Sequence, residues 1–235
     1  MDKLKILQLS CFLTNNIKIN DEVIMNLLIK FKESGINGYL PNVLPINELD
    51  PKNNIIIPKE VLSFISPNNN EIRKQIVLDR DRFVINYEFL KGVAISELEA
   101  FIETESKILD LLLEETKILG KRLAMNITYN LFNNDLISDI IKPPIDFYKE
   151  DFAEWSMRIN KNSKFKINNK LEIFNIISDY RVLSNANLAH LLEYHIDFNT
   201  SQENMQERFD NKSLGDFIKI FKDNKNKFIL EAVKY

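Results

Sequence analysis

Glycine is scarce in this chain, with only five glycines among 235 residues. A loop that wraps a phosphate group needs clustered glycines, because its backbone N–H groups must approach the ligand in conformations with positive φ. Each glycine here stands close to an expected end of a helix or strand, and neither a GxxxxGK[ST] nor a GxGxxG motif occurs. The chain is therefore not expected to fold around a nucleotide phosphate, and no cofactor is predicted.

The composition is that of an ordinary globular chain without a dominant charge. Lys and Arg total 31 against 34 Asp and Glu, which gives a net charge of −3, and there are one Cys and two His. No apolar run approaches the roughly 18 residues that a membrane helix needs, and the N-terminus lacks the apolar stretch of a secretory signal. We therefore expect a cytoplasmic protein that forms no internal disulfide and binds no membrane.

The first half of the chain, residues 1–132, alternates between strand-like and helical patterns. Period-two alternation predicts a strand at 4–13, and helical spacing after Asn20 or Asp21 predicts a helix that ends at Gly35. The following stretch contains four prolines, which predict irregular or edge structure over 37–58. Further strands and one long helix are predicted at 71–78, 82–89, 96–119 and 123–132.

The long helix at 96–119 has the clearest expected ends. Ser96 and Glu99 have the spacing of a capping box, and Gly120 follows the last helical residue. Its apolar residues spread beyond a single stripe. This width fits either a helix covered on both sides within the fold or one that packs against a second copy of the chain.

The second half is predicted to contain antiparallel strands and a C-terminal amphipathic helix that begins near Ser213. Asn, Asp and Pro residues mark 133–151 as a segment that connects residues 1–132 with 152–235, and the two halves are expected to pack as one unit. The predicted class is α+β, mainly antiparallel sheet with two long packing helices and a C-terminal helix. The order of elements in the first half suggests a ferredoxin-like β-α-β-β-α-β arrangement.

Two segments carry a family resemblance. The strand DRDRFVINYEF precedes the long helix, and the pattern LLEYHIDFN precedes a terminal helix that contains FIKIFKDNKNKF. Together they resemble a sporadically distributed family of uncharacterised bacterial proteins. The resemblance implies an α+β fold and an accessory role in bacteria, and it brings no active-site residues with it.

The strand near 188–199 contains the strongest candidate for catalysis. Alternation places Glu193, His195 and Asp197 on one face, each about 7 Å from the next along the strand. An imidazole between carboxylates can act as a general acid or base, or supply part of a divalent metal site. A solvated polar face gives the same pattern, so the metal content is left open and a metal-assisted hydrolase or nuclease remains one alternative.

A basic segment supplies a second alternative, nucleic-acid binding. Its cations could follow a phosphate backbone while one aromatic ring stacks on a base. The candidate residues are Arg158, Lys161, Lys164, Phe165, Lys166 and Lys170. Lysines beside Asn-rich turns also occur simply as solvated surface residues.

The favoured interpretation is a non-enzymatic protein that binds a partner protein, as an accessory of a bacterial or phage system such as defence or toxin control. It depends on the absence of short catalytic and cofactor motifs and on the family resemblance. A homo-oligomer is also expected from the wide apolar surface of the helix at 96–119.

Overall fold

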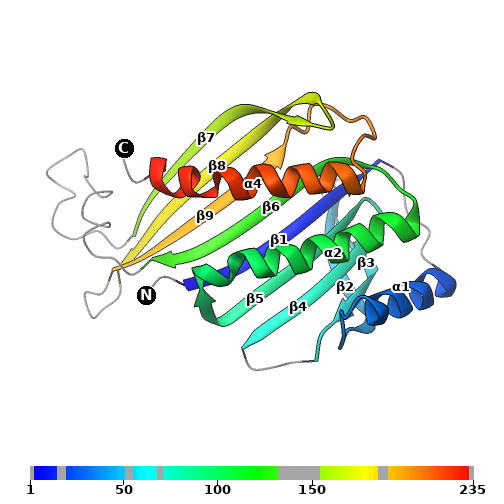
Figure 1. Ribbon diagram of the computed structural model, residues 1–235. Coiled ribbons are helices and arrows are strands. Elements are labelled where there is room, and N and C mark those ends of the chain that lie inside the picture. Colours follow the sequence, from blue (N-terminus) through cyan, green and yellow to red (C-terminus); the bar gives the residue numbers. More distant parts are fainter. Residues whose placement is uncertain are drawn as a thin grey trace, which may run out of the picture.

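The computed structural model describes residues 3–14, 20–50, 55–67, 71–131, 154–184 and 190–232. These residues form one antiparallel sheet of nine strands in the order β2-β3-β4-β5-β1-β6-β9-β8-β7 (Figure 1). The strands are β1 (Lys3–Leu13), β2 (Leu40–Asp50), β3 (Ile55–Ile65), β4 (Ile72–Asp79), β5 (Arg82–Ala94), β6 (Gly120–Leu131), β7 (Glu154–Ile167), β8 (Lys170–Ser184) and β9 (His190–Thr200). The helices are α1 (Asp21–Glu33), α2 (Leu98–Thr116) and α4 (Asn211–Ala232).

The sheet consists of two topologically equivalent halves that meet at β1 and β6. The first half has the strand order β3-β4-β5-β1 and is followed in the chain by α2, whereas the second has β7-β8-β9-β6 and is followed by α4. Among the described residues, the first half differs by the additional elements α1 and β2. At the junction Gln8 pairs with Asn126, whose Nδ2 donates to Gln8 Oε1 at 3.1 Å.

The predicted ferredoxin-like half is wrong. After α1 the chain runs to the edge strand β2 and returns through β3, β4 and β5, each antiparallel to the one before it. Strand β5 then joins β1, and β1 in turn joins β6 of the other half. The sheet is therefore continuous across the two predicted halves, with three helices among the described residues, and the predicted connecting segment 133–151 lies outside the described residues.

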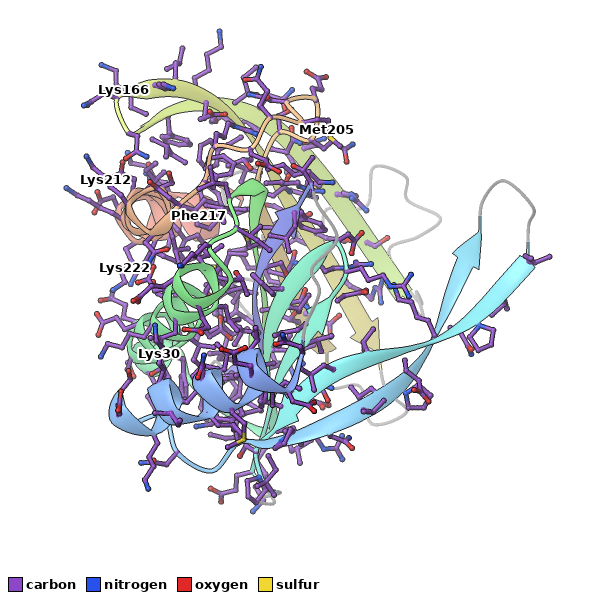
Figure 2. All side chains as sticks on the ribbon, turned by 90° about the vertical axis from the view of Figure 1, so that its right-hand side faces the viewer. Lys30, Lys166, Met205, Lys212, Phe217 and Lys222 are labelled. Atoms are coloured by element: carbon purple, nitrogen blue, oxygen red, sulfur yellow. The ribbon has the colours of Figure 1, made fainter. Side chains whose placement is uncertain are left out.

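All three helices cover the same face of the sheet, as Figures 1 and 2 both show. Alternation along β1 places Leu7, Leu9 and Cys11 on this covered face, where each is fully buried. Phe217 points from α4 toward the sheet in Figure 2, and its ring stacks on that of Phe174 with centroids 5.9 Å apart. The core is thus a single layer of apolar side chains between the helices and one face of the sheet.

Helix α2 lies between α1 and α4 (Figure 1). On one side Lys30 of α1 lies 3.1 Å from Glu115, and on the other Lys222 of α4 lies 2.8 Å from Glu103. The apolar surface of α2 is wide because the helix packs against the sheet and has a neighbouring helix on each side. Four of its apolar residues are buried, namely Ile108, Leu109, Leu112 and Leu113.

The helix ends follow the sequence pattern only in part. Asn20 caps α1 as predicted, because its Oδ1 accepts from the backbone N–H of Val23 at 3.0 Å. The capping box predicted for Ser96 and Glu99 is wrong, since a 3-10 turn over Ile95–Glu97 precedes α2 and no side chain caps the helix.

Gly120 does not end α2 but begins β6. The helix ends at Thr116, and the next residue, Lys117, has the left-handed φ of 52°. A Cβ atom at Gly120 would lie only 2.5 Å from Cys11 Sγ. Gly120 is therefore needed for the close approach of β6 to β1.

The four prolines between residues 37 and 58 led to an incomplete prediction, because most of this stretch is strand. Pro41, Pro45 and Pro58 all lie inside the β2–β3 hairpin. Pro41 pairs with Phe64, Pro45 with Glu60, and Pro58 with Asn47. The β2 members of these pairs, at positions 41, 45 and 47, are even numbers of residues apart, so all three pairs have the same hydrogen-bonding pattern. Proline is tolerated in a non-hydrogen-bonded pair, because there the backbone nitrogen points away from the partner strand. The prolines therefore lie at the outer edges of the hairpin, which agrees with the edge-strand alternative.

Candidate functional site

The open face, defined as the face of the sheet opposite α1, α2 and α4, carries a row of polar side chains. One row crosses the strands directly from neighbour to neighbour and consists of Gln75, Asn86, Gln8, Asn126 and Asp197. Strand neighbours in such a row lie about 4.8 Å apart. The two halves of the sheet thus present one continuous band of amide and carboxylate groups.

Two cavities lie on this face at equivalent places in the two halves. The cavity in the first half has a volume of about 310 Å³, and the one in the second half about 180 Å³. The first is lined from β1, β4 and β5 by Gln8, Gln75, Val77, Asp79, Arg82, Val84 and Asn86. The second is lined from β6, β8 and β9 by Thr128, Asp179, Arg181, Glu193 and His195.

The second cavity contains two of the three predicted catalytic residues. Strand register places His195 between Thr128 on β6 and Asp179 on β8. The His195 Nδ1 and Thr128 Oγ1 atoms are 3.1 Å apart, which orients the imidazole. Glu193 lies in the same cavity, and Asp179 is a carboxylate that sequence reasoning did not include.

Asp197 is not brought into this cavity. It lies one row along β9, where its Oδ1 accepts from Asn199 Nδ2 at 2.8 Å. Among the described residues no group of three His, Cys, Asp or Glu side chains is placed to hold a metal ion. His195, Glu193 and Asp179 thus line one cavity, and Asp197 lies outside it.

The basic segment divides between the two faces of the sheet. Cross-strand pairing puts Arg158, Lys164 and Lys166 on the open face, opposite Asp179, Ile173 and Leu171, respectively. Lys161 and Lys170 lie on the helix-covered side, opposite Ile176 and Ile167. The segment therefore does not present its cations as one stripe.

Phe165 belongs to the packing of the core rather than to an open surface. Its ring is half-buried and meets that of Phe174 edge-on, with centroids 5.1 Å apart. A second contact joins it to Phe198 at 6.3 Å. The Phe165 ring thus takes part in an aromatic cluster with Phe174 and Phe198.

The β2–β3 hairpin forms an arm that leaves the sheet. Strand β3 pairs with β4 only over Leu62–Ile65, whereas its pairing with β2 continues over Ile55–Val61. In Figure 2 this arm reaches away from the three helices and beyond the other strands. The arm was not predicted as a functional element, although the run of three isoleucines at 55–57, directly before Pro58, was a usable signal.

Both strands of the β2–β3 hairpin expose large apolar side chains. The exposed fractions are 62% for Leu40, 55% for Val43, 52% for Ile55 and 66% for Ile56. Cross-strand pairing places Ile55 and Ile56 on opposite faces of the hairpin. Each face of the arm therefore exposes at least one large apolar side chain.

An ion pair ties the arm to the sheet. Lys59 Nζ lies 2.9 Å from Asp79 Oδ1 at the end of β4, and this carboxylate is only 4% exposed. The same Oδ1 accepts from the backbone N–H of Arg80 at 2.7 Å. The charged turn that follows β4 thus helps to hold the root of the arm.

Comparison with known proteins identifies no family. No protein-family model and no curated protein matches the chain. Among solved structures, the di-domain ARO/CYC StfQ from the steffimycin biosynthetic pathway is 8% identical over 97% of this chain and 96% of that chain, with a TM-score of 0.20. A TM-score this low does not indicate a shared fold. Within the described residues, no helix is long and apolar enough to cross a membrane.

Proposed function

We propose that this protein works in the cytoplasm by binding a partner protein, and that the β2–β3 arm is the element that binds it. The observation that carries this proposal is the exposure of Val43, Ile55 and Ile56 on a hairpin that extends beyond β4. Apolar side chains gathered on a projecting element commonly mark a protein–protein contact. Exposure of these apolar side chains to water is unfavourable, and their burial against a partner would lower the free energy.

The construction of the arm supports binding through side chains. An isolated two-stranded hairpin is marginally stable in water, so it gains from being covered. Pro45 removes a donor from the outer edge of β2, and Pro58 removes one from the free edge of β3. A partner strand therefore finds interrupted edges, and the exposed faces remain as the main contact. The partner that fits is a protein with an apolar groove that receives the hairpin.

The proposal is tested by removing the apolar side chains from both faces of the arm. An Ile55→Glu/Ile56→Glu variant is compared with the wild type in affinity purification from the source cells with quantitative mass spectrometry. Leu171→Glu is the matched control, because Leu171 is 61% exposed but lies on β8 in the other half. We expect a partner that the wild type and Leu171→Glu retain and the arm variant loses.

Binding of the purified partner is then titrated with all three proteins. A loss of affinity of about tenfold or more in the arm variant alone supports the proposal. Equal affinity for the arm variant and the wild type, with both folded, refutes it.

A further inference from the structure

One edge of β7 has no neighbouring strand within the described part of the chain. Strand β7 ends the strand order of the sheet, where it pairs with β8 (Figure 1). No backbone hydrogen bond joins its outer edge to another element among the described residues. An edge of this kind presents N–H and C=O groups that a further strand can bind.

The strand pairing determines which backbone groups of β7 point outward. Ser201 N–H donates to the carbonyl oxygen of Ile173 at 2.7 Å, so the backbone polar groups of Ile173 face β9 rather than β7. Ile173 pairs with Lys164, which therefore belongs to a non-hydrogen-bonded pair and directs its own N–H and C=O to the outer edge. Every second residue of β7 does the same. The outward residues are Ser156, Arg158, Asn160, Asn162, Lys164 and Lys166.

This edge is long, exposed and uninterrupted. All six outward residues have exposed side chains, and from Ser156 to Lys166 they extend over roughly 34 Å at the usual rise per residue. Strand β7 contains neither proline nor glycine, whereas β2 at the other end of the sheet contains Pro41 and Pro45. The two ends of the sheet therefore differ, and only the β7 edge offers consecutive donors and acceptors along the described strand.

The charges along this edge favour an acidic strand. Three outward residues are cations, namely Arg158, Lys164 and Lys166, and the other three are serine or asparagine. Lys164 and Lys166 lie opposite Ile173 and Leu171 of β8, so neither faces an acidic residue there. Opposite charges that face each other across two strands stabilise the pair, and like charges destabilise it. A second copy of β7 would double the positive charge and fits poorly.

We infer that the outer edge of β7 binds an extended acidic segment of another protein, which joins the sheet as a further antiparallel strand. Main-chain hydrogen bonds to the outward residues provide affinity, and acidic side chains opposite Lys164 and Lys166 provide specificity. The antiparallel direction continues that of β7, β8 and β9. This surface lies at the opposite end of the sheet from the β2–β3 arm and does not depend on the function proposed for the arm.

The test uses synthetic peptides about as long as β7, in which threonine alternates with a second residue. The second residue is glutamate in one peptide and lysine in another. A third peptide is the glutamate peptide with the backbone nitrogen of every glutamate methylated. In antiparallel pairing with the glutamates opposite the outward residues, those nitrogens donate to β7, so methylation removes the donors and keeps the charge.

Fluorescence anisotropy of the labelled peptides, titrated with the full chain at low ionic strength, measures the three affinities. We expect the glutamate peptide to bind at least about tenfold more tightly than the other two. Equal affinity of the lysine peptide or of the methylated peptide overturns the inference. No binding of the glutamate peptide at about 1 mM also overturns it.

Two substitutions of Asn162 test strand addition in the protein itself. The N–H of Asn162 points outward, so Asn162→Pro removes a donor from the edge without breaking a hydrogen bond to β8. We expect Asn162→Pro to lose affinity for the glutamate peptide by about tenfold or more, and the matched control Asn162→Thr to retain it. Circular dichroism checks the fold of both variants. Unchanged affinity in folded Asn162→Pro contradicts strand addition.

A second pair of variants tests the charges. Lys164→Glu/Lys166→Glu is expected to lose affinity for the glutamate peptide by about tenfold or more. Lys212→Glu/Lys219→Glu on α4 changes the net charge equally at two exposed lysines and is expected to bind like the wild type. An equal loss in both double variants would mean that overall charge, rather than the β7 edge, attracts the peptide, and overturns the inference.

The same experiments distinguish two other occupants of the edge. A single-stranded oligonucleotide is titrated in parallel, because phosphates are also attracted to these cations. Tighter binding of the oligonucleotide than of the glutamate peptide overturns the inference. A homodimer in size-exclusion chromatography that Asn162→Pro abolishes would identify a second copy as the occupant, and likewise overturns it.

Discussion

Lys59 and Asp79 form an ion pair of 2.9 Å between the β2–β3 arm and the end of β4. Lys59 lies three residues before Leu62, where the pairing of β3 with β4 begins. The ion pair therefore helps to fix the direction of the arm relative to the sheet. The arm thus combines exposed apolar side chains with an anchored root. A positioned hairpin loses less conformational entropy when a partner binds than a free one does.

We predict that Asp79→Ala destabilises the protein by about 2 kcal/mol, because it removes the carboxylate that pairs at 2.9 Å with the ammonium group of Lys59, whose side chain is only 16% exposed. The measurement is urea unfolding followed by circular dichroism. Asp81→Ala is the control in the same turn, because the Asp81 side chain is 53% exposed and is expected to contribute less than about 1 kcal/mol. Equal effects of the two substitutions would mean that the root of the arm is not held by this pair.

We predict that Pro45→Thr/Pro58→Thr increases self-association beyond that of the wild type. The substitution restores N–H donors at the two outer edges of the hairpin, and open edges pair with other strands. Light scattering coupled to size-exclusion chromatography over a dilution series measures the mass. A mass that stays identical to that of the wild type would show that the prolines do not protect these edges.

We predict that Glu105→Leu stabilises the protein at pH 7 by about 1–3 kcal/mol. The fully buried Glu105 carboxyl on α2 has no hydrogen-bond partner among the described residues, and the substitution replaces it with an apolar side chain of similar size. The folded-state pKa of Glu105 lies well above its ordinary value of 4.5. Above pH 4.5 the unfolded state releases the proton that the folded state keeps, so the wild type loses stability as the pH rises toward the folded-state pKa.

The advantage of Glu105→Leu should therefore be smaller at pH 4.5 than at pH 7. Unfolding free energies of both proteins at the two pH values give this difference directly, since other titrating groups largely cancel between them. A gain from leucine that shrinks as the pH rises would contradict a buried, protonated Glu105.

We predict that Gly120→Ala destabilises the protein by about 1–3 kcal/mol through overpacking between β6 and β1. The new methyl group would lie 2.5 Å from Cys11 Sγ, whereas its other neighbours leave ordinary contact distances. In Cys11→Ala/Gly120→Ala the sulfur is gone, so much of the loss should be recovered. Strictly additive effects in this double-mutant cycle would rule out the steric explanation.

Local patterns in the sequence predicted individual elements well. The alternation of Leu7, Leu9 and Cys11 correctly gave β1, and Asn20 correctly gave the start of α1. The charged residues after Leu78 also correctly marked the turn between β4 and β5. In each case the information lies within a few residues, where side-chain periodicity or a single cap determines the backbone.

The arrangement of these elements was not predictable in the same way. The pairing of Gln8 with Asn126 joins residues far apart in the chain, and no local pattern indicates it. Gly120 looked like a helix end because the constraint on it comes from Cys11 on another strand. The predicted site was incomplete for the same reason. Asp179 is placed beside His195 by the register of β8 and β9, which no local sequence pattern indicates.

The most direct test of partner binding by the arm is site-specific photo-cross-linking in living source cells. A photoreactive amino acid replaces Ile56 on the arm in one strain and Leu171 on β8 in another, since both positions are similarly exposed. We predict that the residue at position 56 cross-links to one defined protein and that the residue at position 171 does not. Cross-links to the same proteins from both positions, or none from position 56 at normal expression, would contradict the proposal that the arm binds a partner.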